Sequence, residues 1–249
     1  MVRIKQKKGG LIMSFYQEIT PFYDQIFPTN EQTLRFLSIC FKGKRNLLDV
    51  GAGTGNMAFS LANSGFMVTA IEPEETMIEE IHKKVVKSSN HFQVDSKSML
   101  QLDELTSTFD GIYCIGNTLA HLTNLQEISQ FFRQSYQKLE TDGIFIIQMV
   151  NFKKVLTNNL FSFPIIENNH FSFERKYDLD GEKIQFTTSL KVKDLEEPIT
   201  NTIPLFPATA EQIIPILESI GSREITSYGK FDFTPYTHDS PALIIVSKK

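Results

Sequence analysis

The chain has 249 residues, a formal net charge of −4 at pH 7 and a pI near 5.8. This length suffices for one large domain or two small ones. The acidic balance excludes the basic footprint that nucleic-acid binding requires, and no stretch approaches the roughly 18 apolar residues of a membrane span. A small molecule or a protein is therefore the favoured partner.

The N-terminus and the cysteines bear on where the protein works. Residues 1–12 are basic, contain glycines and lie outside the periodic pattern, and their apolar stretch is too short for a signal peptide. We expect this segment to be mobile and dispensable, with Met13 as an alternative start. Cys40 and Cys114 each lie beside apolar residues, which predicts reduced core thiols in a cytoplasmic protein.

From residue 36 to residue 150, predicted strands alternate with predicted helices. Hydrophobic periodicity predicts strands over 46–50, 66–73, 91–95, 109–116 and 144–150, and helices over 36–41, 56–65, 74–89 and 124–140. Such alternation predicts an α/β fold with a Rossmann-like, mostly parallel sheet covered by helices on both faces.

After Asn151 the pattern changes. Two runs with period-two alternation, 171–179 and 183–192, are joined at Asp180-Gly181, which predicts an inserted antiparallel β-hairpin region. A helix over 209–221, a segment 223–233 and an antiparallel last strand over 242–249 are expected to complete the core sheet.

The stretch LLDVGAGTGN, residues 47–56, places a buried strand directly before glycines at alternate positions. Three glycines provide either a tight connection or bare backbone against a ligand. The spacing G-x-G-x-G departs from the dinucleotide pattern G-x-G-x-x-G, because Asn56 stands where the last glycine would be. This weakens the interpretation as a pyrophosphate site.

Two carboxylates accompany this turn. Glu72 ends the second strand, about 20 residues on, where an acid accepts both hydroxyls of a ribose; the alternative is a solvated strand-end carboxylate. Asp49 lies inside an apolar strand end, so it needs the N–H groups of the turn or a ligand ammonium as its partner.

Four motifs in order resemble class I S-adenosylmethionine-dependent methyltransferases: LLDVGAGTGN, IEPEETM, VDSKSM and FDGIYCIGNTLAHL. They span about a hundred residues, from Leu47 to Val150. The stretch GNTLAHL is similar, more narrowly, to the glycine and sarcosine N-methyltransferase branch and its small-molecule relatives. N-P-P-Y and D-P-P-Y are absent at this place, which disfavours methylation of a nucleobase or glutamine amide.

The resemblance implies S-adenosyl-L-methionine as the cofactor and no metal. It implies that Asp95 accepts from the adenine amino group, and that Ser96 meets the ring through its N–H. Met77 and Met99 either pack on the adenine or only in the core. The implied cofactor-binding residues are Tyr16, Asp49, Gly51, Ala52, Gly53, Thr54, Gly55, Asn56, Glu72, Pro73, Met77, Asp95, Ser96, Met99, Ile115, Gly116 and Asn117.

The acceptor side has four candidate residues. His121 faces the substrate or is structural, and Tyr23, with Tyr16, either approaches the sulfonium or belongs to a purely amphipathic helix. Arg175 is the one charge on the apolar face of its strand, so it forms an internal salt bridge, extends to water or grips an acceptor carboxylate or phosphate. Asn151 is the second acceptor-binding candidate.

Together these observations predict a methyltransferase that acts on a small-molecule amine or hydroxyl, with or without a carboxylate. The alternatives are a non-catalytic protein that binds S-adenosylmethionine or S-adenosylhomocysteine, and a nicotinamide-dependent oxidoreductase. We expect a monomer or homodimer without nucleic-acid or membrane partners.

The predicted regions of the chain are an arm and cofactor-covering helix (1–30), the cofactor-binding core (31–151), inserted strands that cover the substrate side (152–206) and C-terminal elements that complete the sheet (207–249).

Overall fold

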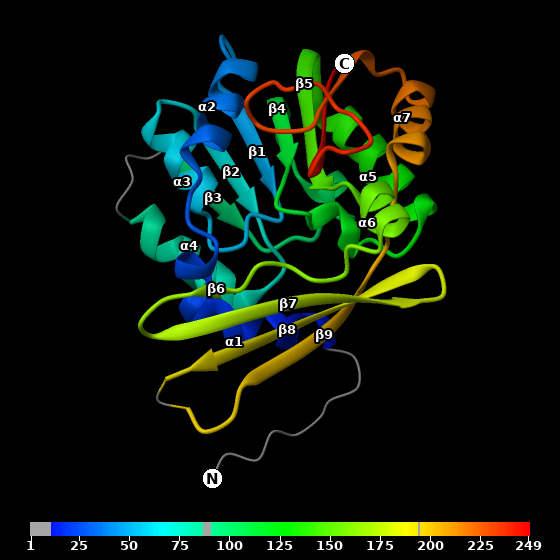
Figure 1. Cartoon of the computed structure of the whole chain (residues 1–249). Helices are drawn as coiled ribbons and strands as arrows, with labels where there is room; N and C mark the ends of the chain where they lie inside the picture. The colour runs from blue at the N-terminus through cyan, green and yellow to red at the C-terminus, as the bar shows by residue number, and fades with distance from the viewer. Residues whose placement is uncertain (1–10, 87–90, 194) are drawn as a thin grey trace.

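The computed structural model describes residues 11–86, 91–193 and 195–249, and for residues 11–15 only the backbone. Its strands form a seven-stranded sheet in the order β10-β11-β5-β4-β1-β2-β3 and a four-stranded sheet in the order β6-β7-β8-β9 (Figure 1). The strands of the first sheet are β1 (Asn46–Val50), β2 (Met67–Ile71), β3 (Phe92–Asp95), β4 (Phe109–Cys114), β5 (Leu139–Val150), β10 (Arg223–Tyr228) and β11 (Ala242–Lys248).

The seven-stranded sheet is mostly parallel. Strand β1 pairs in parallel with β2 and β4, and β11 is antiparallel to both β5 and β10. The strand order reverses between β1 and β4, and in open α/β sheets ligands bind beyond the carboxyl ends of the strands at this point. The predicted fold class, including the antiparallel last strand, is confirmed.

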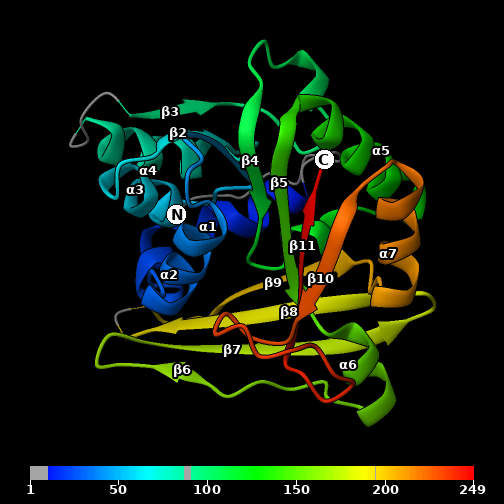
Figure 2. The ribbon, with the colours of Figure 1, turned by 90° about the horizontal axis from the view of Figure 1, so that it is seen from above.

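Helices cover both faces of this sheet (Figure 2). On one face, Phe36, Leu61 and Ile81 are fully buried in one hydrophobic cluster, and on the other, Phe131 and Leu217 belong to a second cluster. The helices are α1 (Leu11–Ile26), α2 (Glu31–Cys40), α3 (Asn56–Asn63), α4 (Glu75–Val85), α5 (Leu125–Lys138), α6 (Phe152–Asn158) and α7 (Ala210–Ser219), with short 3-10 helices η1 (Leu102–Glu104) and η2 (Thr118–His121). None of the described helices is long and apolar enough to cross a membrane.

The four-stranded sheet, hereafter the roof sheet, lies across the end of the seven-stranded sheet at which β1 and β2 finish (Figure 1). It is antiparallel throughout and consists of β6 (Ile166–Glu167), β7 (Phe171–Asp180), β8 (Lys183–Val192) and β9 (Ile199–Leu205). Phe22 of α1 and Phe27, directly after this helix, contact the rings of Phe171 and Phe173 in this sheet.

Three local expectations differ from the structure. Leu139, predicted on the helix over 124–140, instead begins β5, because it pairs with Phe109 and is buried there. The region after Asn151 contains α6, β6 and β9 besides the predicted hairpin. Helix α1 starts at Leu11, within the segment expected to be mobile; residues 1–10 of that segment lie outside the described residues.

The two cysteines differ in burial. Cys114 is buried, Cys40 is partly exposed, and both are free thiols.

Gly111 of β4 allows the closest packing between the sheet and α2. A Cβ atom there would lie 2.4 Å from Phe41 Cε1 and 2.8 Å from Leu47 Cδ2, and both side chains are fully buried. We therefore expect Gly111→Ala to lower the free energy of unfolding by about 1–3 kcal/mol, measured by urea denaturation. Adding Phe41→Leu is expected to recover part of the loss, whereas strictly additive effects of the two substitutions would contradict this packing argument.

Candidate active site

The glycine turn after β1 presents backbone to a cavity. Gly51 and Gly53 have φ angles of 70° and 58°, in the left-handed region that favours glycine. A Cβ on Gly53 would lie 3.1 Å from the Tyr23 hydroxyl oxygen, and one on Gly51 would lie 2.3 Å from Thr118 Cγ2. Gly55 differs, because a Cβ there would meet the core side chains of Ile81 and Phe92. Gly51 and Gly53 thus face the cavity, and Gly55 serves helix packing.

Two buried carboxyl groups flank the turn. Glu72, at the end of β2, accepts hydrogen bonds from the N–H groups of Gly53 at 2.9 Å and Glu74 at 3.1 Å. Burial raises the pKa of both Glu72 and Asp49 to about 7. Both groups are therefore poised to ionise when a ligand supplies hydroxyl donors or a positive charge.

Three cavities open at this edge of the sheet, and we name each by one residue. The Glu72 cavity and the Asp49 cavity, of about 220 and 270 Å³, lie along the glycine turn, and the Arg175 cavity, of about 330 Å³, lies against the roof sheet. Tyr23 and Gly116 line all three. A molecule in any of them therefore meets these two residues.

The cavities bring together most of the predicted site residues. The Glu72 cavity is lined by Tyr16, Tyr23, Gly51, Gly53, Glu72, Pro73, Met77, Met99, Gly116 and His121, and the Asp49 cavity adds Asp49, Ala52, Thr54, Asn56 and Ile115. The Arg175 cavity includes Asn117, His121 and Arg175. Asp95 and Ser96 line none of the three, so their predicted contact with adenine stays a prediction; Ser98, Met99 and Leu100 line that end of the Glu72 cavity.

Asn151 lies outside these cavities and its side chain is used structurally. The residue is 2 % exposed and caps α6 by accepting from Lys154 N–H. Its amide donates to the carbonyls of His238 and Ser240, and its Oδ1 accepts from the Tyr236 hydroxyl. These bonds hold the β10–β11 loop, so we do not carry Asn151 into the proposed acceptor site.

Sequence reasoning missed Gln148. Its side chain lines the Asp49 and Arg175 cavities, and its Oε1 accepts from Gly116 N–H at 2.7 Å. The sequence contained an indication of its role, because Gln148 is the single polar residue in the apolar run IFIIQMV of β5.

Helix α1 brings two tyrosines to the cavities. The Tyr16 hydroxyl lies 2.8 Å from His121 Nε2, and the two tyrosine rings meet edge to face at 6.5 Å. Burial lowers the pKa of His121 to about 4, so the imidazole is neutral at pH 7. The same burial raises the pKa of both tyrosines, which keeps their hydroxyls protonated.

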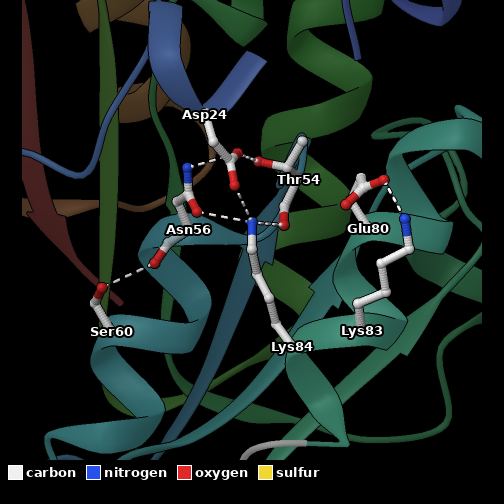
Figure 3. Close-up of polar contacts among 7 residues, drawn as sticks. All are labelled: Asp24, Thr54, Asn56, Ser60, Glu80, Lys83 and Lys84. Carbon is white, nitrogen blue, oxygen red and sulfur yellow. Dashed lines mark hydrogen bonds and ion pairs between the residues drawn. The ribbon is translucent and has the colours of Figure 1, made fainter. Parts of the chain in front are cut away.

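A polar cluster ties α1 to the glycine turn (Figure 3). In this Asp24 cluster, Asp24 accepts from the Thr54 hydroxyl, the Asn56 amide and the Lys84 ammonium. Lys84 of α4 also donates to Thr54 O and Asn56 Oδ1, both at 2.7 Å. Lys84 thus uses all three donors to join α4, the turn and the helix that carries Tyr16 and Tyr23.

Comparison with known proteins finds a methyltransferase domain in this chain. A family model described as a methyltransferase domain matches residues 47–143. The glycine/sarcosine N-methyltransferase of Aphanothece halophytica is 21 % identical over 208 residues, covering 83 % of this chain and 77 % of that protein. The chain carries a class I S-adenosylmethionine-dependent methyltransferase domain.

Two solved methyltransferase structures share the fold. An S-adenosylmethionine-dependent methyltransferase of Clostridium acetobutylicum has a TM-score of 0.78 at 14 % identity, with 94 % of this chain and 98 % of that chain covered. A sugar N-methyltransferase of a Streptoalloteichus species has a TM-score of 0.72 at 16 % identity, with 100 % and 97 % covered. Methyltransferase membership decides against the nicotinamide-dependent alternative.

The groups around the glycine turn of this methyltransferase domain fit S-adenosylmethionine. The ligand offers a ribose diol, a sulfonium and an ammonium group, and the turn offers bare backbone beside two buried carboxyl groups, Glu72 and Asp49. Each Glu72 oxygen accepts one backbone N–H and retains a lone pair for a hydroxyl. The Glu72 and Asp49 cavities, which both reach Tyr23, thus each contain one of these carboxyl groups.

The raised pKa values predict that cofactor binding depends on pH. Ribose hydroxyls and positive charge favour the ionised carboxylates, so binding lowers the two pKa values and releases protons. Affinity for S-adenosylmethionine is therefore expected to rise at least tenfold from pH 5.5 to pH 8, measured by calorimetric titration. Glu72→Gln should weaken binding at pH 8 by about 1–3 kcal/mol and flatten this dependence. Glu79→Gln, at an exposed site on α4, is the control, and a Glu72→Gln profile equal to the control would contradict the assignment.

The Asp24 cluster predicts a charge-dependent rate of cofactor release. Lys84→Met removes the cation that joins α1 to the turn, so we expect S-adenosylmethionine to dissociate about 3- to 10-fold faster in stopped-flow chase experiments. Lys83→Met is a matched control, because Lys83 pairs with Glu80 on the same helix, away from the turn (Figure 3). High salt should speed release from the unsubstituted protein more than from Lys84→Met. Equal rates for the two variants would show that the cluster does not restrain α1.

Proposed function

We propose that this methyltransferase transfers the methyl group of S-adenosylmethionine to an amine or hydroxyl of a small molecule that carries an anionic group. The supporting observation is the junction of the Glu72 and Arg175 cavities, which share Tyr16, Tyr23, Gly116 and His121. A cofactor on one side and an acceptor on the other would meet at these residues. The similar proteins named above, whose acceptors are glycine, sarcosine and sugars, also support a small acceptor.

On the cofactor side, Glu72 would hold the ribose hydroxyls and Asp49 the ammonium group, directly or through water. Backbone of Gly51 to Gly53 would lie along the ligand, since any side chain there would collide with Tyr23 or Thr118. Bound S-adenosylmethionine supplies an activated methyl group, so the protein needs chiefly to align nucleophile, carbon and sulfur and to exclude water.

The residues at the junction would orient the nucleophile. As the bond from nitrogen or oxygen to the methyl carbon forms, the carbon–sulfur bond breaks and its electron pair stays on sulfur, and the methylated acceptor gives its proton to solvent water. Neutral His121 offers a hydrogen-bond acceptor, but with a pKa near 4 it is a weak base. We therefore assign His121 to holding the Tyr16 hydroxyl, and Tyr23 to closing the junction. An amine would arrive already deprotonated.

Arg175 supports the anionic character of the acceptor. Its guanidinium donates to Pro164 O at 2.9 Å and lies 5.1 Å from the centre of the Phe163 ring. Within the described parts of the chain it forms no ion pair with a carboxylate, so the internal salt bridge considered from the sequence is not formed. A half-buried cation at the wall of a cavity favours a negatively charged ligand.

The direct test is turnover. The purified protein is incubated with S-adenosylmethionine and pooled amines, amino acids and hydroxylated metabolites, and S-adenosylhomocysteine is quantified by mass spectrometry. Release that depends on one acceptor, together with its methylated product, supports the proposal. Tight cofactor binding with no release in any pool would favour the non-catalytic alternative.

With an acidic acceptor found, Arg175→Lys tests the acceptor side. Lysine keeps the charge but loses the planar fork, so we expect the KM of the acceptor to rise at least tenfold, about 1.4 kcal/mol, at unchanged cofactor affinity. Arg133→Lys, at an exposed position on α5, is the control. An unchanged KM in Arg175→Lys would make Arg175 structural.

A further inference from the structure

The inner face of the roof sheet carries a second polar group beside Arg175. Thr188 of β8 is the direct cross-strand neighbour of Arg175 on β7, and both residues line the Arg175 cavity. Side chains at such paired positions stand about 4.5–5.5 Å apart at their Cβ atoms. The two residues therefore lie side by side in the wall of this cavity.

Each of the two residues has one buried polar atom that lacks a hydrogen-bond partner. Thr188 is 1 % exposed, and neither its Oγ1 nor Arg175 Nε has a hydrogen-bond partner among the described residues. An unsatisfied buried donor costs about 1–3 kcal/mol, and valine would fill the space of Thr188 without this cost. The pair is therefore better explained by a ligand than by packing.

Apart from Asn117, His121 and Gln148, the rest of the cavity wall is mostly apolar and largely aromatic. It includes Phe27, Phe163, Phe173, Tyr177, Phe186 and Leu205. Because His121 is neutral, Arg175 supplies the charge among the described lining residues, which matches a ligand group with one negative charge. The volume of about 330 Å³ falls in the range of pockets that hold small organic molecules.

We propose that Arg175 and Thr188 together bind a carboxylate, one oxygen at Arg175 Nε and the other at Thr188 Oγ1, while the aromatic wall holds an apolar, ring-bearing body. The acceptor class is then a carboxylic acid with such a body, and Thr188 is a specificity-determining residue. This inference rests on the proposed function in taking the Arg175 cavity as the acceptor site. A flat carboxylate, unlike a phosphate, matches two donors on neighbouring strands and a single cation.

Binding of small probes tests the site without requiring turnover. The protein saturated with S-adenosylhomocysteine is titrated calorimetrically with phenylacetate, with its neutral isostere phenylacetamide, and with acetate. We expect phenylacetate to bind at least tenfold more tightly than either of the others. If acetate binds as tightly as phenylacetate, the claim that the aromatic wall holds a ring-bearing body is wrong. If phenylacetamide binds as tightly as phenylacetate, the claim that the site binds a carboxylate is wrong.

Substitutions on the two faces of β8 assign the effect to Thr188. Thr188→Val should weaken phenylacetate binding at least fivefold, and Thr188→Ser should restore it. Thr187→Val is the matched control, because Thr187 is the adjacent residue on the opposite face and its hydroxyl bonds to Thr202. Equal phenylacetate affinities for Thr188→Val and Thr187→Val, with both variants folded by thermal unfolding, would overturn the role of Thr188.

Failure of this inference differs from failure of the proposed function. Thr188-dependent binding of phenylacetate without methyl transfer to any acceptor leaves the ligand site standing and contradicts the function. Methyl transfer to an anionic acceptor that has no carboxylate, such as a phosphate ester, with equal kcat and KM in Thr188→Val and Thr187→Val, leaves the function standing and overturns the inference.

Discussion

The close approach of Tyr23 to the backbone at Gly53 is the contact on which the arrangement of the site depends. A Cβ at Gly53 would lie within 3.4 Å of three Tyr23 atoms, so any side chain there would press Tyr23 away from the turn. With α1 in place, Tyr23 borders all three cavities and Tyr16 reaches His121. The left-handed turn therefore leaves room for the tyrosine of α1 that borders all three cavities.

Burial then sets the protonation of the groups around this helix. It raises the pKa of Asp49 and Glu72, lowers that of His121 and keeps Tyr16 and Tyr23 protonated. A site of this kind favours neutral groups until a ligand brings charge. A cationic cofactor would pair with the carboxyl group of the Glu72 cavity. An anionic acceptor would pair with the guanidinium of the Arg175 cavity.

The roof sheet gives the cavity on its side a different chemical character. Its inner face is aromatic, and its two inward polar groups, on Arg175 and Thr188, stand at one register position of β7 and β8. The matched methyltransferase domain, residues 47–143, contains the glycine turn and Glu72, whereas the roof sheet lies after it. In the proposed function, the acceptor is selected by residues after the matched domain, so those strands can vary without disturbing the cofactor turn.

Much of the fold and of the cofactor side could be predicted from the sequence, because those features are local. Alternating strands and helices, the G-x-G-x-G turn, Glu72 at a strand end and the Asp180-Gly181 hairpin each depend on neighbouring residues and on backbone preferences. Arg175 was recognisable for the same reason, as the charge that breaks a period-two pattern.

Only the tertiary structure decided which distant residues meet. Asn151 and Gln148 are both polar residues in or next to β5, yet the β10–β11 loop engages the first and the second lines two cavities. Lys84 of α4 donates a hydrogen bond to Asp24, which lies sixty residues earlier in the chain. Thr188 follows the expected inward register, but its lack of a partner depends on what β7 and β9 place around it. Such contacts join segments far apart in sequence, and no local pattern encodes them.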